Sequence, residues 1–240
     1  MRILITYIAL ITSVYLAEAQ NKNAYQQGIS AEENLRAISN LSATSIGGIG
    51  FDTRYKGIRG SPMLFDTLLI SFLKISNQDK YIQLESNIDL VSNSVHFVHP
   101  KTKQMVALSG NKITEIIISS GNNDLIFRTM EGSLLKKDAG DYVFYQVLND
   151  DPYQLIKVPS KEFIEADYKQ AYSPGRQFDE FNTTYKYYII SDNGTINPCQ
   201  LTERSLAKLF PDKKKIIDNV TKGKSYTDKE AMVMDILKNF

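Results

Sequence analysis

The side chains that carry most enzymatic and metal chemistry are scarce in this sequence. It has one cysteine, Cys199, and two histidines, His96 and His99, which stand three positions apart. In an extended strand, residues at this spacing point to opposite faces, so we do not expect the two imidazoles to bind one metal ion. No cysteine or cluster of carboxylates stands close enough in the sequence to complete a zinc site. The sequence therefore predicts no metal site and no cofactor.

Cys199 allows two sharper interpretations, a nucleophile and an intermolecular disulfide. It follows Asn197 and Pro198, a pair that favours a turn, and neither histidine is near it in the sequence. Free cysteines are commonly buried, so we expect a semi-buried small residue at this position.

Pairs of neighbouring acids, Asp150–Asp151 and Asp179–Glu180, are the remaining candidates for acid–base chemistry. Acidic side chains are mostly exposed to solvent, and the chain lacks the Gly-x-Ser-x-Gly and His-Glu-x-x-His motifs. We therefore assign no catalytic residue and favour a non-enzymatic role. A hydrolase that uses the acids between Asp150 and Glu180 is an alternative without a recognisable motif.

The first residues have the order of a cleavable secretory signal peptide. Arg2 gives a positive start, residues 3–16 form an uncharged, mostly apolar stretch, and Ala17-Glu18-Ala19 offers small residues at both positions that a signal peptidase reads. This order predicts a signal peptide at residues 1–19, with cleavage after Ala19 so that Gln20 begins the mature chain. Because the lone cysteine cannot form an internal disulfide, a bacterial envelope fits better than a disulfide-rich ectodomain. We expect an exported protein, in the periplasm, at the outer-envelope surface or outside the cell.

The composition of the chain is that of a globular protein. Of its 240 residues, 42% are hydrophobic and 23% are charged, and the net charge is only +1. A net charge this small gives no overall positive field, which argues against a nucleic-acid partner. No later segment is long and apolar enough to span a bilayer; an uncleaved N-terminal anchor is the alternative to a signal peptide.

Local patterns divide the mature chain into three parts. Residues 20–60 are polar and rich in glycine, and the capping-box pattern from Ser30 to Glu33 predicts a short helix to about Ser39. Residues 61–200 have the pattern of an antiparallel β domain, and residues 201–240 switch to helical periodicity. The predicted fold class is α+β, with an antiparallel, curved β-sheet or partial barrel and a small C-terminal helical segment.

Within the β domain, polar turns separate short β-branched segments about every ten residues, which is typical of an antiparallel meander. Asp192-Asn193-Gly194 has the chemistry of a hairpin turn, because Asn and Gly tolerate positive φ. The segment near 159–181 is rich in charge and tyrosine and does not alternate, so we interpret it as a long ordered loop, with a helical turn near Phe163 to Tyr168. Long irregular segments in compact domains are often functional, which makes this loop the first place to look for a site.

Three short helices are expected to pack on one face of the sheet. Pro211 should end the first helix, and Asp212 should cap the second. The sequence Thr227-Asp228-Lys229-Glu230 has the capping-box pattern for the third.

A resemblance to known proteins rests on five segments: residues 51–62 (FDTRYKGIRGSP), 142–148 (YVFYQVL), 166–172 (ADYKQAY), 178–181 (FDEF) and 187–188 (YY). Together they resemble exported, signal-peptide-bearing proteins of uncharacterised function that are common in Bacteroidota. The similarity covers most of the mature chain. It implies an envelope or secreted location and implies no activity.

Two functions of different class are consistent with these observations. The first is a non-enzymatic binding or structural protein of the cell envelope, with an envelope protein as partner. The second is a periplasmic carrier of an apolar or lipid ligand, for which a curved sheet and an amphipathic helical cover would enclose the ligand. The sequence assigns neither a ligand-binding residue nor an oligomeric state.

Overall fold

The computed structural model describes residues 30–44, 46–49, 57–76, 78–121, 123–135, 142–166 and 178–240. The signal peptide predicted at residues 1–19, with its cleavage site at Ala17, Ala19 and Gln20, lies outside the described residues and stays a prediction.

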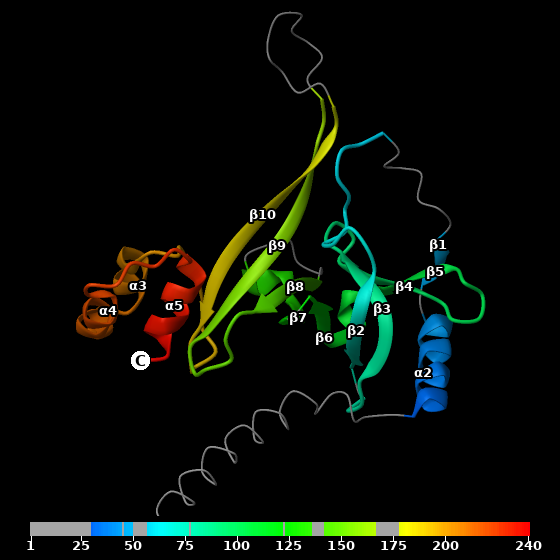
Figure 1. Cartoon of the computed structure of the whole chain (residues 1–240), viewed down its shortest axis with the longest axis horizontal. Coiled ribbons are helices and arrows are strands. Elements are labelled where there is room, and N and C mark those ends of the chain that lie inside the picture. The colour runs from blue at the N-terminus through cyan, green and yellow to red at the C-terminus, as the bar shows by residue number, and fades with distance from the viewer. Residues whose placement is uncertain are drawn as a thin grey trace, which may run out of the picture.

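One antiparallel sheet runs through the described part of the chain (Figure 1). Its 11 strands lie in the order β1-β5-β4-β3-β2-β6-β7-β8-β9-β10-β11, so β1 and β11 are its edges and the sheet is not closed. The strands are β1 (Ile46–Ile49), β2 (Leu69–Ile75), β3 (Ile82–Asp89), β4 (Ser94–Val98), β5 (Met105–Ser109), β6 (Ile113–Ser120), β7 (Asn123–Glu131), β8 (Tyr142–Val147), β9 (Gln154–Ile164), β10 (Glu180–Ile190) and β11 (Ile196–Cys199). The predicted α+β fold with a curved antiparallel sheet and C-terminal helices is confirmed.

Apart from β1, which pairs with β5, the sheet consists of two meanders that join where β2 pairs with β6. The first contains β2 to β5 and the second contains β6 to β11, each with neighbouring strands paired in sequence order. The chain passes from one meander to the other through a 3-10 turn at Gly110–Lys112. A Cβ at Gly110 would lie 2.9 Å from the carbonyl oxygen of Asn93 and 3.3 Å from the Phe144 ring, so this crossing requires a glycine.

Helix α2 (Ala31–Thr44) packs on the first meander. Ser30 caps it, because the Ser30 hydroxyl accepts a hydrogen bond from the Glu33 amide at 3.2 Å. The reciprocal half of the predicted capping box is wrong, since the Glu33 carboxylate pairs with Lys80 at 2.8 Å. Ile38 and Leu41 of α2 join the N-terminal cluster, a buried core that also includes Leu73, Ile88, Val95, Phe97, Ile116, Phe127 and Phe144.

Helices α3 (Glu203–Leu209), α4 (Lys214–Thr221) and α5 (Lys229–Leu237) follow β11, with a 3-10 turn at Pro211–Lys213. As predicted, α3 ends before Pro211. Two predicted caps are wrong: Asp212 lies inside the 3-10 turn, and α5 is capped by Asp228, whose carboxylate accepts a hydrogen bond from the Glu230 amide at 2.8 Å. The helices pack against β9 to β11 in the C-terminal cluster, which contains Leu155, Ile189, Cys199, Leu206, Ile217, Met232, Val233, Ile236 and Leu237.

Both faces of the sheet are buried at β9 and β10. Leu155 lies in the C-terminal cluster, whereas its neighbour Ile156 lies in the middle cluster on the other face, as strand alternation requires. The middle cluster contains Met130, Leu135, Val143, Tyr145, Ile156, Val158 and Tyr188.

The loop predicted near 159–181 is wrong over most of its described length, because β9 continues to Ile164 and β10 begins at Glu180. The two strands pair in an unbroken register from Gln154 opposite Ile190 to Ile164 opposite Glu180. Beyond their contacts with β8 and β11 they form a two-stranded arm, which extends from the sheet in Figure 1. The helical turn expected near Phe163 is likewise replaced by strand, and residues 167–177 lie outside the described part.

Candidate functional site

The outer side of β10 is covered at both of its ends. At one end, β11 pairs with residues Tyr187 to Ile190. At the other end, the Phe181 amide donates a hydrogen bond to the Arg59 carbonyl, and the Arg59 amide donates one to the Asp179 carbonyl, both at 2.9 Å. Between them, no strand of the described chain pairs with the outer side of residues 182–186. We call this stretch the open edge.

Thr183 and Tyr185 are the residues of the open edge whose backbone groups point outward. The Phe181 amide points away from β9 because it bonds to Arg59, and orientation alternates along an antiparallel strand. Residues 183 and 185 therefore also present their N–H and C=O groups outward. The amide of Ser191, which bonds to the Thr195 carbonyl at 3.0 Å on the β11 side, agrees with this alternation.

The open edge exists because β11 leaves the sheet at Gln200. The last pair is Cys199 opposite Tyr187. The Gln200 amide then bonds to the Ser205 hydroxyl at 3.1 Å, and the Thr202 hydroxyl accepts the Ser205 amide at 3.2 Å as the cap of α3. These contacts turn the chain into α3 before it can continue along β10.

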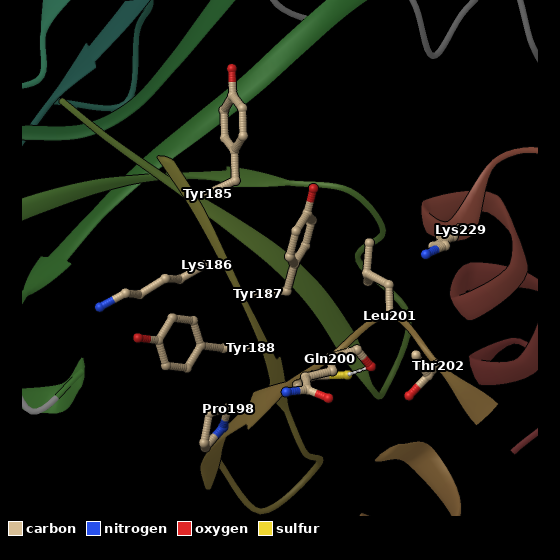
Figure 2. Close-up of a pocket in the computed structure, with 10 residues that line it drawn as sticks. Tyr185, Lys186, Tyr187, Tyr188, Pro198, Gln200, Leu201, Thr202 and Lys229 are labelled. Atoms are coloured by element: carbon tan, nitrogen blue, oxygen red, sulfur yellow. Dashed lines mark hydrogen bonds between the residues drawn. The ribbon is translucent and has the colours of Figure 1, made fainter. Parts of the chain in front are cut away.

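A pocket of about 500 Å³ lies where β11 ends and the open edge begins (Figure 2). Strand β10 supplies all three of its tyrosines, the end of β11 and the segment that leads to the Thr202 cap of α3 supply a second wall, and α5 supplies a lysine. The lining residues are Tyr185, Lys186, Tyr187, Tyr188, Pro198, Cys199, Gln200, Leu201, Thr202 and Lys229.

Next to the pocket, Glu230 of α5 joins Lys157 of β9 and Tyr187 of β10. The Glu230 carboxylate lies 2.9 Å from the Lys157 ammonium and accepts a hydrogen bond from the Tyr187 hydroxyl at 2.6 Å. Burial, together with the hydrogen bond to Glu230, raises the pKa of Tyr187, so the phenol stays protonated and acts as the donor. The Lys157 ammonium also lies 4.5 Å from the centre of the Tyr185 ring. This network fixes α5 against β9 and β10 at the base of the arm.

The charged residues that line the pocket are both lysines, Lys186 and Lys229. No carboxylate lines it, and neither lysine forms an ion pair with another described residue. Glu230, the neighbour of Lys229 on α5, is engaged by Lys157 and Tyr187. The charged side chains that line the pocket are therefore positive only, among the residues that the structure describes.

Cys199 is buried, more fully than the semi-buried residue that the sequence predicted. It is 7% exposed, and its thiol donates a hydrogen bond to the Gln200 carbonyl at 3.2 Å. Burial raises the pKa of Cys199 to about 11, against a smaller opposing effect of Ser205. A thiol with so high a pKa is a poor nucleophile at neutral pH.

The two histidines lie in different environments and do not meet. His96 is buried, with Nε2 3.1 Å from the Ser94 hydroxyl and 3.7 Å from the Asp89 carboxylate. His99 Nδ1 accepts hydrogen bonds from the amides of Lys101 and Thr102 in the turn after β4. Within the described ranges, no group of three or more His, Cys, Asp or Glu side chains is arranged to hold a metal ion.

The acid pairs are separated and engaged in structural contacts. Both oxygens of Asp150 bind the Arg128 guanidinium, at 3.1 and 3.0 Å, and this hydrogen bonding lowers the pKa of Asp150. Asp179, at the far end of the arm, accepts the Ala166 amide at 2.7 Å. The structure thus does not bring the two pairs together.

The residues of the pocket are ones that sequence reasoning missed. The available signal was the run Thr-Thr-Tyr-Lys-Tyr-Tyr at residues 183–188, in which hydroxyls, aromatic rings and a lysine alternate on a strand.

Among the described residues, every helix falls short of the length and apolarity that a bilayer crossing requires. No family model, curated protein or solved structure matches this chain.

Proposed function

We propose that this chain is an exported, non-enzymatic binding protein of the cell envelope that holds a polypeptide partner at the open edge of β10 and the adjacent pocket. The export part of the proposal rests on the signal-peptide pattern at residues 1–19. The binding part rests on one observation. Over residues 182–186, β10 pairs with β9 on one side, whereas no described strand pairs with its outer side, which lies next to the pocket.

The two edges of the arm differ in a way that supports this role. Exposed strand edges pair readily with other chains, and proteins usually block them with proline or charge. On the β9 side, Pro159 stands opposite Tyr185 and has no N–H to offer, and Lys161 follows two residues later. On the β10 side, Thr183 and Tyr185 keep their outward N–H groups. The arm is thus blocked against pairing on one edge and open on the other.

The carrier interpretation finds less support in the packing. An apolar ligand between the sheet and the C-terminal helices needs space there. Leu155 and Ile189 of the sheet and Val233 of α5 are all fully buried in one cluster, so protein side chains fill that region. A partner at the strand edge is the better supported function.

Site-specific crosslinking in the producing cells tests the proposal. A photoreactive amino acid replaces Tyr185, which is 49% exposed at the open edge, and the control replaces Leu134, which is 57% exposed in the 3-10 turn after β7 and does not line the pocket. We expect a discrete light-dependent protein adduct from position 185 and none of the same size from position 134. Absence of an adduct at 185 in cells that export the protein would contradict the binding role.

Export is tested separately by sequencing the N-terminus of the protein recovered from the envelope fraction. The expected first residue is Gln20. A chain that begins at Met1 and stays in the cytosol would contradict the location, whatever the crosslinking result.

A further inference from the structure

We infer that the segment held at the open edge is an extended acidic peptide that pairs with β10 as an added strand. The inference rests on the proposed function and names the chemistry of the partner. Three features of the described residues carry it: the orientation of the backbone groups, the boundaries of the open edge, and the charge of the pocket.

The backbone of the open edge has the groups that strand addition uses. Thr183 and Tyr185 each present one N–H and one C=O outward, so an added strand forms main-chain hydrogen bonds at both residues. A residue in a strand advances the chain by about 3.3 Å, so residues 182–186 accommodate on the order of five residues of a partner.

The boundaries of the open edge define where the added strand lies. Cys199 is the last residue of β11 at one end, and Arg59 bonds to Phe181 at the other. Both residues already bond to the outer side of β10, so a peptide strand between them would fill the gap on that side. Gly60 makes the approach of the Arg59 segment close, since a Cβ there would lie 3.5 Å from the Phe181 Cβ, and its φ of +80° suits glycine.

The charge of the pocket selects the side chains of the partner. Lys186 lies on the same strand face as Tyr188, which belongs to the middle cluster, whereas Lys229 lies on α5, which packs on the opposite face. Figure 2 shows the two lysines on either side of β10. Successive side chains of an added strand point to opposite faces, so two adjacent acidic residues meet one lysine each. An acidic partner therefore compensates both charges.

Synthetic peptides test the charge preference directly. The probes are fluorescein-labelled Thr-Val-Glu-Glu-Val-Thr and its charge-reversed form Thr-Val-Lys-Lys-Val-Thr, titrated with the mature protein and followed by fluorescence anisotropy. We expect the acidic probe to bind about tenfold more tightly or better, and its affinity to fall as salt is added. Equal affinity for both probes, or no binding of the acidic probe, overturns the inference.

The variant Lys186→Glu tests whether the preference for the acidic probe depends on the charge of the pocket. We expect it to weaken binding of the acidic probe by about tenfold, because an attraction becomes a repulsion. The matched control is Lys101→Glu, the same change at an exposed turn remote from β10, which should leave the affinity within about twofold. Equal effects of the two variants would show a non-specific charge effect and overturn the inference.

A pair of proline variants tests strand addition itself. Thr183 and Lys161 stand opposite each other in the arm, and both have N–H groups that face away from the partner strand. Thr183→Pro removes a donor from the open edge, whereas Lys161→Pro removes one from the β9 edge, at similar cost to the arm. We expect Thr183→Pro to abolish most binding of the acidic probe and Lys161→Pro to retain it, with near-ultraviolet circular dichroism confirming that both fold.

The outcomes separate this inference from the proposed function. If crosslinking at position 185 succeeds but Thr183→Pro binds the acidic probe as tightly as the wild type, the binding role stands and strand addition is wrong. If light scattering shows a dimer that Thr183→Pro dissociates, a second copy of this chain occupies the edge and the acidic peptide does not.

Discussion

Glu230 determines which charges remain available in the pocket. Its carboxylate engages Lys157 and the Tyr187 hydroxyl, with the Lys157 and Glu230 side chains 21% and 24% exposed. Partly buried charges are costly unless they are paired, so this contact is expected to persist when a partner binds. Lys186 and Lys229 are then the cations that a ligand meets.

Cys199 should be unreactive in the folded protein. Because burial raises its pKa to about 11, the reactive thiolate is scarce at pH 8. Titration with Ellman's reagent should show slow reaction of the native protein and rapid, stoichiometric reaction after unfolding in urea, with Cys199→Ser as the blank. Rapid native reaction would show that the thiol is accessible and ionised, contrary to the structure.

Asp150 should stabilise the fold in a pH-dependent manner. Hydrogen bonds from Arg128 lower the pKa of Asp150 from its ordinary value of 3.8. A carboxyl whose folded pKa is depressed stabilises the protein above the unfolded pKa, and this effect is lost as the pH falls through the folded pKa. The Tm difference between wild type and Asp150→Asn should thus be largest near neutral pH and shrink below pH 3.8. A difference that stays constant down to pH 2 would be inconsistent with this ion pair.

At the scale of elements, β3 anchors the segment that precedes β2 through one buried amide. The Asn87 side chain accepts the Phe65 amide at 3.1 Å and donates to the carbonyls of Phe65 and Thr67 at 2.7 and 3.1 Å. Asn87 is only 2% exposed, so these contacts form away from water. These hydrogen bonds fix the path of the backbone between Arg59 and β2.

Replacement of Asn87 by alanine should destabilise the protein by about 2–3 kcal/mol, because it leaves buried backbone groups without partners. Urea unfolding measures this change. The exposed Asn111, changed to alanine in the same way, should alter the free energy of unfolding by less than about 0.5 kcal/mol. Equal effects of the two variants would show that the amide of Asn87 carries no special weight.

Most strands were predictable from their alternation, and the hairpin turn at Asp192-Asn193-Gly194 is confirmed, with Gly194 at a φ of +79°. The arm was not predictable in the same way. Residues 159–164 contain a proline and charged side chains, because beyond β8 the strand no longer packs between two neighbours. Pro159 fits because its nitrogen faces away from β10. Local propensity therefore favoured a loop where long-range pairing forms a strand.

The whole molecule is held together by a continuous sheet rather than by one core. The N-terminal and C-terminal clusters lie toward opposite ends of the sheet, and the strands between them pair without a break. The two ends are therefore expected to unfold together, in one cooperative transition.

Valine-to-alanine changes at the two ends test this cooperativity. Val95 lies in the N-terminal cluster and Val233 in the C-terminal cluster, and both are fully buried. Each change should cost about 2 kcal/mol through lost burial and a residual cavity. Each should shift one shared transition, seen identically by far- and near-ultraviolet circular dichroism. Two separate transitions, of which each variant moves only one, would show that the ends fold independently.

The candidate site could not have been predicted from sequence alone, since it depends on three segments that are distant in the chain. The tyrosines and Lys186 of β10 are visible as a run, but their accessibility depends on where Arg59 arrives and where β11 departs. The departure is encoded locally by the Thr202 cap, whereas the arrival of Arg59 follows from the course of the chain before β2. No residue of the pocket or of the open edge lies in the loop predicted near 159–181; the open edge begins just after it, at residue 182.

The position of β1 has a consequence for the order in which the protein assembles. Strand β1 pairs with β5, with Ile46 opposite Ala107, although β2, β3 and β4 come between them in the chain. A ribosome adds residues one after another, so β1 is made early but has no partner until β5 has also emerged. Such distant pairings are slow to close. Strand β1 is thus made before β2 to β4 but joins the sheet only after β5 has emerged.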